Sequence, residues 1–193
     1  MPWEKQFDTA DVLDKAMLAF WERGYEATSM QDLVDRTGVN RGSLYTTYGD
    51  KHALFLASLR MYDEQVRKRL LREMESRFTP HEAIRKLFLA FADSVSETGN
   101  NRGCFLTNSA LELAQRDKEV GQVVAASQED IEAFFVRLIR KGQVAGEISE
   151  DLKPTQTARG LLASLIGLIV LTRSRPDKTL LHSIVDDVVR RLE

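Results

Sequence analysis

Cysteine is almost absent from this sequence of 193 residues, because Cys104 is the only one. A single cysteine cannot form an intrachain disulfide, and chains without disulfides are typical of a reducing compartment. The first residues, Met1 to Lys5, show neither the basic region nor the apolar region of a signal peptide. We therefore expect a cytoplasmic protein.

Long apolar runs are also scarce. The longest extends from Leu161 to Leu171, and a membrane span needs about 20 such residues. This stretch is predicted to be a buried helix, so no membrane partner is expected.

Residue patterns that carry catalysis are missing as well. The three histidines, His52, His81 and His182, fall on three different predicted helices without metal-ligand spacing. The sequence has no phosphate-binding glycine loop and no Gly-x-Ser-x-Gly turn. We expect no enzymatic activity, no metal site and no cofactor.

Positive charge is in short supply at the N-terminal end. Residues 1–50 carry five Lys and Arg against nine Asp and Glu, a net charge of −4, within a chain of net charge −2. Binding to a polyanion through bulk electrostatics is therefore disfavoured. A local positive surface around Arg41 and Lys51 remains compatible with these numbers.

What the sequence does contain is helical periodicity, without strand-like alternation of useful length. The chain is predicted to be all-α. The first helix begins at Asp8 or Thr9 and ends at Gly24, and Asp50 starts a long helix that reaches about Arg77. Further helices are expected over residues 80–97, 104–113, 117–141, 154–171 and 177–192, with a break at 99–103.

The long helix after Asp50 is strongly charged in its second half, where basic residues from Arg67 to Arg77 alternate with acidic ones. We interpret this half as a solvated surface with paired side chains rather than as a second DNA contact. Thr79, Pro80 and Glu82 predict a capping box at the start of the next helix.

Two short helices joined by a glycine turn occupy residues 28–48. Thr28 and Gln31 predict a capping box, and Gly38 is suited to the left-handed conformation that ends a helix. Asn40 is a good N-cap for the second helix and Gly49 a good stop. This second helix presents small polar, basic and tyrosine side chains, which indicates a helix-turn-helix whose second helix enters the major groove of DNA. An ordinary surface hairpin is the alternative.

The same stretch resembles the N-terminal signature of the TetR family of bacterial transcriptional repressors. The residues that carry the resemblance run from Gly38 to Tyr45 and continue with Tyr48, Asp50, Lys51, Ala53 and Leu54. The match extends from about Leu13 to Phe55, and the rest of the chain shows looser similarity to the family's ligand-binding domain. The resemblance implies a three-helix DNA-binding head over residues 1–50 and a helical ligand-binding and dimerisation body over 51–193. Many members carry several basic residues before the first helix, whereas this chain has only Lys5.

The head is expected to bind a double-stranded DNA operator. Arg41 and Lys51 are expected on phosphates, and Tyr45 and Thr46 on base edges. The full set of predicted DNA-binding residues is Thr28, Arg41, Gly42, Ser43, Tyr45, Thr46, Thr47, Tyr48 and Lys51.

The body is expected to bind a small-molecule effector that releases the operator. The predicted ligand-binding residues are Tyr62, Phe88, Phe91, Cys104, Phe105, Asn108 and Phe134. Cys104 follows Arg102 at a helix start, which favours a thiolate that senses electrophiles, but a small buried side chain is the commoner fate of a free cysteine.

A homodimer is expected because the helix from Pro154 is apolar on nearly every side and needs cover. The predicted interface pairs this helix and the preceding one with their copies through Phe135, Leu138, Leu161, Leu165, Leu168 and Ile169. The function predicted from all these features is a ligand-responsive transcriptional regulator. A helical adaptor or ligand-binding protein without DNA binding is the alternative, supported by the acidic head.

Overall fold

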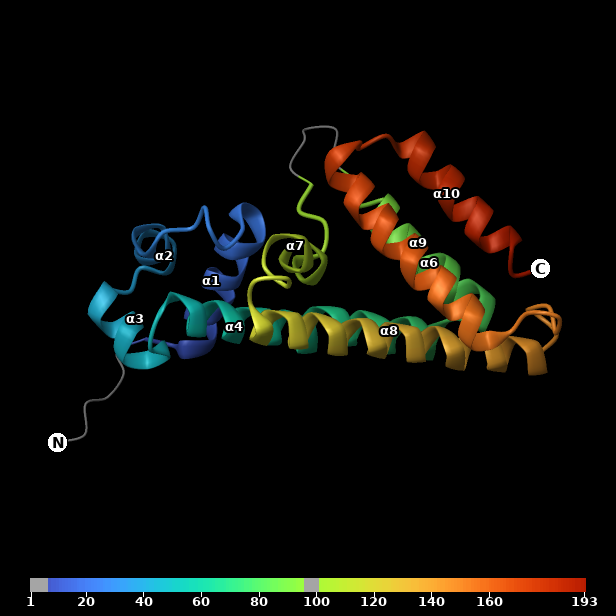
Figure 1. Cartoon of the computed structure of the whole chain (residues 1–193), viewed down its shortest axis with the longest axis horizontal. Helices are drawn as coiled ribbons and strands as arrows, with labels where there is room; N and C mark the ends of the chain where they lie inside the picture. The colour runs from blue at the N-terminus through green and yellow to red at the C-terminus, as the bar shows by residue number, and fades with distance from the viewer. Residues whose placement is uncertain (1–6, 96–100) are drawn as a thin grey trace.

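The computed structural model describes residues 7–95 and 101–193, and within these ranges every regular element is helical. Helices α1 (Thr9–Arg23), α2 (Met30–Thr37) and α3 (Arg41–Tyr48) form a head at one end of the molecule. The other end is a body built from α6 (Pro80–Ala92), α7 (Phe105–Glu112), α8 (Lys118–Val144), α9 (Pro154–Ser174) and α10 (Lys178–Arg190) (Figure 1). The predicted all-α class, with a helix-turn-helix head and a larger helical body, is confirmed.

The head and the body share one long helical rod. It comprises α4 (Lys51–Tyr62), a π-helical turn η1 (Asp63–Arg67) and α5 (Lys68–Arg77). Helix α4 packs against α1, and α5 packs against α6 in the body. A π-turn holds one extra residue in the helix and is frequent at functional sites. The sequence prediction of a single helix over 50–77 is therefore right in extent and misses this turn.

Arg67 lies in this turn and is only 6% exposed. The expectation of a solvated surface is wrong at this position, because α8 packs over the guanidinium and supplies Asp130 as a partner at 2.9 Å. The expectation of paired surface side chains is right at Lys68, which pairs with Glu64 at 2.9 Å, and at Arg77, which pairs with Glu73 at 2.5 Å.

Two predicted capping boxes differ from the structure. At α2 the box is formed by Ser29 and Asp32, whose side chains bond reciprocally to each other's backbone N–H at 3.1 and 2.8 Å. At α6, Thr79 occupies the cap position but makes no capping bond with its side chain. Proline at the first position already fixes the backbone there.

The body is a layered bundle in which α8 packs along α9, and α6 contacts α8, α9 and α10. Helix α9 is long and apolar enough, by length and composition alone, to cross a membrane. The helix is longer than the apolar run from Leu161 to Leu171, so its length is nearer to that of a membrane span than the sequence predicted. Its inner side nevertheless packs on α8, with Leu165 and Leu168 buried.

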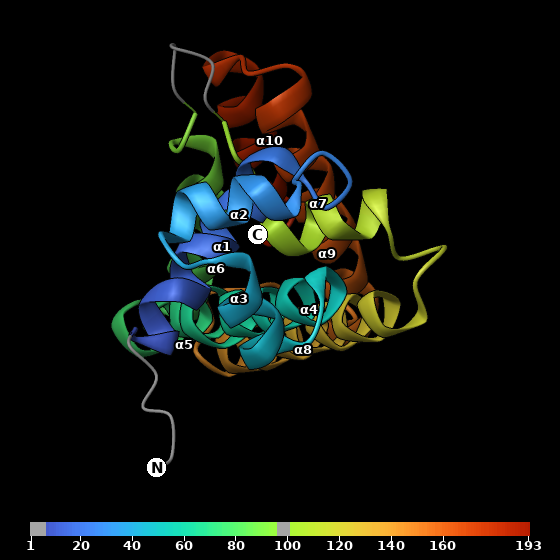
Figure 2. The ribbon, with the colours of Figure 1, turned by 90° about the vertical axis from the view of Figure 1, so that its left-hand side faces the viewer.

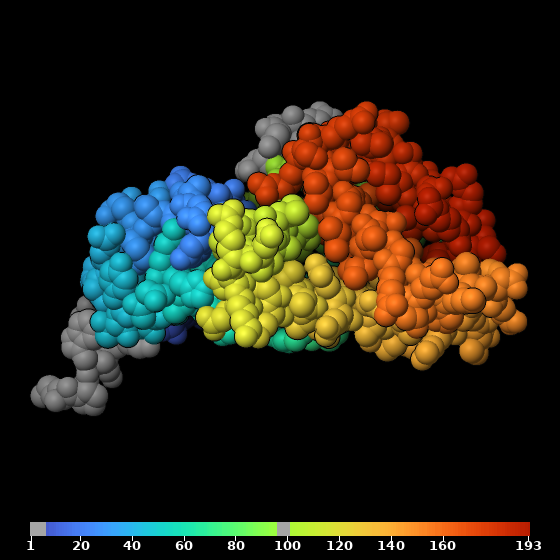
Figure 3. Space-filling model, viewed as in Figure 1, coloured from blue at the N-terminus to red at the C-terminus, as the bar shows by residue number. Residues whose placement is uncertain are grey.

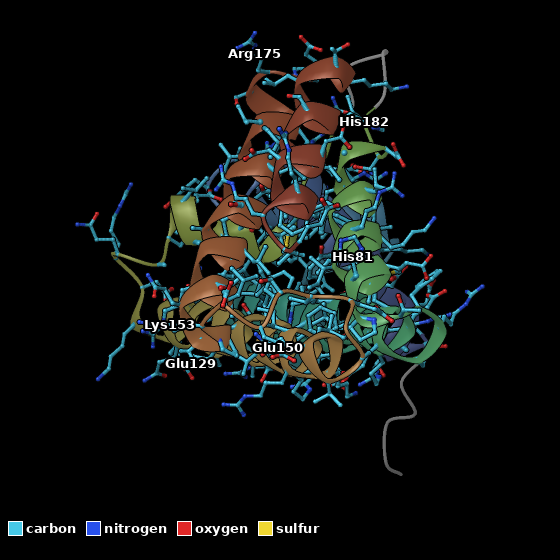
Figure 4. The ribbon with its side chains drawn as sticks, turned by 90° about the vertical axis from the view of Figure 1, so that its right-hand side faces the viewer. His81, Glu129, Glu150, Lys153, Arg175 and His182 are labelled. Carbon is cyan, nitrogen blue, oxygen red and sulfur yellow. The ribbon has the colours of Figure 1, made fainter. Side chains whose placement is uncertain are left out.

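The three histidines stay apart. His182 on α10 pairs with Asp93 at the C-terminal end of α6 at 2.9 Å, whereas His81 lies in the first turn of α6 (Figure 4). His52 on α4 contacts Asp117 at 2.5 Å. Across residues 7–95 and 101–193, no group of His, Cys, Asp and Glu is arranged to hold a metal ion.

Candidate nucleic-acid interface and effector cavity

The turn between α2 and α3 is built by local hydrogen bonds. Gly38 adopts φ = 74° and donates its N–H to Val34, a backbone conformation that is strained for residues with a Cβ. The hydroxyl of Thr37 donates to the carbonyl of Leu33 at 2.7 Å and accepts the N–H of Val39 at 3.2 Å. Asn40 then caps α3 by accepting the N–H of Ser43 at 2.9 Å. These bonds fix the angle between the two helices.

Helix α3 divides into a buried and an exposed side. Leu44 is 1% exposed and packs into the core of the head, whereas Arg41, Gly42, Tyr45 and Thr46 are exposed. Tyr45, at 41% exposed, is one of the few large apolar side chains on the surface of the described chain. Figure 2 views the molecule from the head end, where α3 lies at the surface.

The charge on this exposed side is positive although the head is acidic overall. Helix α3 contains Arg41 and no acidic residue, and Arg41 makes no ion pair within the described ranges. Two of the acids on α1 and α2 are paired within the head: Asp32 with Arg23 at 2.6 Å and Glu22 with Arg36 at 3.1 Å. Hydrogen bonds from Ser29, together with Arg23, lower the pKa of Asp32. The arrangement leaves a local cation where a phosphate would approach.

Thr28 and Ser43 do not belong to this exposed side. Thr28 is fully buried and its hydroxyl donates to the carbonyl of Gly24 at 2.6 Å. Ser43 is 7% exposed and faces the head core. The prediction of a DNA contact is wrong for Thr28, because its side chain is fully buried in the head. For Ser43 it stays a prediction, which rests on the place of this residue in the first turn of α3.

Tyr48, Thr47 and Lys51 lie at the edge of the interface. The hydroxyl of Tyr48 donates to the carbonyl of Thr9 at 2.9 Å and so joins α3 to the start of α1. Lys51 lies over the ring of Tyr25, with Nζ 4.3 Å from its centroid. Thr47 is partly exposed. Lys5, the one basic residue expected in an N-terminal arm, lies outside the described residues.

A cavity of about 40 Å³ lies in the body between the rod and helices α6 to α9. It collects three of the predicted ligand-binding residues, Tyr62, Phe91 and Cys104. Burial raises the pKa of Tyr62 well above its usual value, with a further contribution from the neighbouring Cys104 thiol. The rest of its lining is mainly aliphatic, from Leu70, Leu71, Leu87, Leu106, Val124, Ile131, Leu162, Leu165, Ile166 and Ile169.

Four predicted ligand-binding residues do not line this cavity. Phe88, Phe105 and Phe134 are at most 1% exposed and form the core, where Phe105 packs edge-on against Phe55. Asn108 donates instead to the carbonyl of Arg102 at 2.8 Å. Phe105 and Asn108 line a separate, more open hollow between α1 and α7, whereas Phe88 and Phe134 belong to the core. The ligand-binding role of these four residues stays a prediction.

Two family models match the chain. "Bacterial regulatory proteins, tetR family" matches residues 12–58, and "Tetracyclin repressor-like, C-terminal domain" matches residues 80–187. The chain is also 33% identical over 183 residues to YezE of Bacillus subtilis, an uncharacterised helix-turn-helix transcriptional regulator, with 94% of each chain covered.

The protein belongs to the TetR family. It is accordingly a DNA-binding transcriptional regulator and not an enzyme.

Two further proteins are similar to the chain over most of its length. The repressor ComR of Escherichia coli is 29% identical over 170 residues, covering 88% of this chain and 81% of ComR. A cysteine-substituted form of the TetR-family regulator CifR, solved with 26-base-pair operator DNA, is 25% identical with a TM-score of 0.84, covering 99% of this chain and 100% of CifR.

The structure also corrects the predicted positions of the dimer residues. Phe135, Leu138, Leu161, Leu165, Leu168 and Ile169 are all 5% exposed or less within a single chain. They are core residues of one protomer, where Phe135 packs against Phe88 of α6, and they offer almost no surface to a second copy. The sequence identified two apolar helices, but the side on which each is covered depends on packing.

Sequence reasoning missed the polar members of the cavity, Arg67, Thr107, Ser127 and Gln128. The charged neighbours of Arg67 in the sequence favour a solvated face and so hide its role. The sequence signal that could have revealed the burial of Arg67 is the pair of apolar residues Val66 and Leu70 on either side of it. Their spacing predicts that this side of the rod packs against the body.

Proposed function

We propose that this protein is a repressor that binds a palindromic operator as a homodimer in the cytoplasm and leaves the DNA when a small molecule enters the body cavity. The observation that carries the proposal is the exposed side of α3. Its residues Arg41, Tyr45 and Thr46 combine a phosphate-binding cation with side chains suited to base edges and to the thymine methyl group. The repressor name of ComR and the operator-bound form of CifR support the same role.

The rod supplies a route from the cavity to the head. Tyr62 and Arg67, which line the cavity, lie in the same continuous helix as Lys51, at the edge of the proposed interface. A ligand that displaces the middle of this helix therefore changes the position of α4 and of the helices packed on it. The size of the effect is limited by the difference in the ligand's affinity for the two arrangements.

The outer side of α9 is the proposed dimer contact. It carries the small exposed residues Gly160, Ala163 and Gly167, next to the partly exposed Val170. Small side chains allow two helices to approach closely, and the surface lies beside α8 on the face shown in Figure 3. Light scattering at micromolar concentration should give a dimer, and Ala163→Arg should give a monomer. A monomeric wild-type protein would contradict this contact.

Fluorescence anisotropy on labelled DNA from upstream of the protein's own gene tests operator binding directly. Binding should be specific and should weaken between 50 and about 200 mM salt. The competing function, an adaptor whose helix-turn-helix contacts protein, rests on the acidic head. It predicts no saturable DNA binding at either salt concentration.

A further inference from the structure

Arg67 holds a hydrogen-bond donor that no described residue satisfies. Its Nε donates to the carboxylate of Asp63, and its Nη2 donates to Asp130 at 2.9 Å. Its Nη1 is buried and has no partner in the described parts of the chain. An unpaired buried donor costs about 1–3 kcal/mol, so a structure that keeps one invites a functional explanation.

The cavity lining also contains the polar residues Thr107, Ser127 and Gln128, of which Thr107 and Gln128 are partly exposed. The hydroxyl of Ser127 donates to the carbonyl of Val124 at 2.7 Å, and Tyr62 lies beside the Cys104 thiol. Arg67, 6% exposed, thus places one buried free donor in an otherwise largely apolar lining. The lining matches a ligand that is mostly hydrocarbon and carries one acceptor.

The charge of Arg67 determines which acceptor is suitable. Asp63 and Asp130 already place two negative charges on one guanidinium. A third carboxylate would be repelled by both and would lose its hydration on entering the cavity. A neutral oxygen, such as that of a ketone, ester or amide, accepts the bond without this penalty.

We propose that the effector is a small, largely apolar molecule with one neutral oxygen acceptor, which binds Nη1 of Arg67. This inference rests on the proposed effector-released function and specifies its ligand. The cavity volume of about 40 Å³ accommodates about three water molecules, at 10–15 Å³ each. Any larger ligand must widen the cavity. Because Arg67 lies in the π-turn of the rod, widening the cavity at this residue displaces the rod.

Three probes of nearly equal shape separate the alternatives: acetophenone, ethylbenzene and benzoate. Acetophenone differs from ethylbenzene by the carbonyl and from benzoate by the absence of charge. Isothermal titration calorimetry on the full-length protein should show acetophenone binding about tenfold more tightly than ethylbenzene, the size expected for one hydrogen bond to a charged donor. Benzoate should bind more weakly than acetophenone.

Arg67→Lys keeps a cation beside Asp63 and Asp130 but lacks the second terminal nitrogen. It should remove the preference for acetophenone over ethylbenzene. Arg69→Lys is the matched control, because Arg69 is exposed and lies two residues away on the same rod; this variant should retain the preference. Circular dichroism establishes whether both variants fold. If Arg67→Lys does not fold, the order in which the wild-type protein binds the three probes tests the proposal.

Equal binding of acetophenone and ethylbenzene by the wild type, tightest binding by benzoate, or binding of none of the three would each overturn the proposal. The same samples are assayed for operator binding without any probe. Loss of that activity contradicts the DNA-binding function alone, whereas intact DNA binding with the wrong probe order contradicts only the ligand class.

Discussion

The carboxylate of Glu112, at the end of α7, accepts the backbone N–H of Tyr25 at 3.1 Å, in the loop that follows α1. Its second oxygen accepts the N–H of Glu26 at 2.9 Å. A Cβ on Gly24 would lie 2.8 Å from this carboxylate, so α7 of the body packs tightly against the loop after α1. This contact joins the helix that lines the cavity to the DNA-binding head independently of the rod.

Glu112→Ala should therefore lower the stability of the whole chain. Both N–H groups are near the surface and water can replace part of the lost bonding, so we expect about 1 kcal/mol and a fall in Tm of about 2–4 °C. Thermal unfolding followed by circular dichroism measures it. Glu129→Ala, an exposed acid on α8, is the control and should leave Tm within about 1 °C of the wild type, the scatter of surface substitutions. Equal Tm values for the two variants would show that the contact contributes nothing.

Arg41→Ala should weaken operator binding on every DNA sequence. Arg41 is the exposed cation of α3, so its loss removes one phosphate contact and reduces the slope of log K against log salt by about one. Anisotropy titrations at several salt concentrations give the slope. Arg85→Ala, an exposed arginine on α6 in the body, should leave the slope unchanged. A wild-type slope for Arg41→Ala would remove this residue from the phosphate contacts.

Gly38→Ala should destabilise the head for conformational reasons alone. Gly38 has φ = 74°, and a Cβ added at this position would meet no atom within 4 Å. The cost is therefore that of a left-handed residue with a side chain, about 1–2 kcal/mol. Gly38→Asn should cost less, because asparagine tolerates this conformation better. Urea unfolding of both variants measures the difference; an equally large loss for asparagine would point to steric crowding instead.

Glu75 makes stability depend on pH. Hydrogen bonds from Arg137 and Lys141 lower the pKa of Glu75 below its ordinary value of 4.5. Burial acts in the opposite direction but does not outweigh them. A depressed carboxyl pKa stabilises the fold fully above the unfolded value, and this contribution is lost as pH falls through the folded pKa. Glu75→Gln should cost up to about 1 kcal/mol at pH 7, since both partners are largely exposed. In urea unfolding the gap from wild type should narrow as pH falls below the ordinary pKa of 4.5, and a constant gap would contradict the assignment.

Cys104 should react slowly in the native protein. It is 7% exposed and lies against Tyr62 in the cavity lining, and buried cysteines are inert unless the structure opens. Ellman's reagent should label the native thiol at least about tenfold more slowly than the urea-unfolded chain. Rapid labelling without unfolding would favour the electrophile-sensing interpretation. In that case Cys104→Ser should abolish operator release by N-ethylmaleimide.

The sequence by itself determined the local framework of this protein. Caps and stops such as Asp8, Gly38, Asn40, Asp50 and Gly49 act through backbone groups within a few residues of themselves, so their effect can be predicted without knowing the fold. The order of the helix-turn-helix elements follows from the same local rules, whereas the burial of Thr28 and Ser43 within it does not. The family resemblance, which rests on these residues, is confirmed.

Tertiary structure alone decided which side of each helix is covered. Arg67 is buried because α8 brings Asp130 to it, 63 residues away in the sequence. Phe135 and Leu165 are buried because α8 packs against both α6 and α9 within one chain. Cys104 and Phe105 are adjacent in the sequence, yet the first lines the cavity and the second fills the core. Periodicity identifies an apolar side of a helix, but the partner that covers that side is fixed only when distant segments pack together.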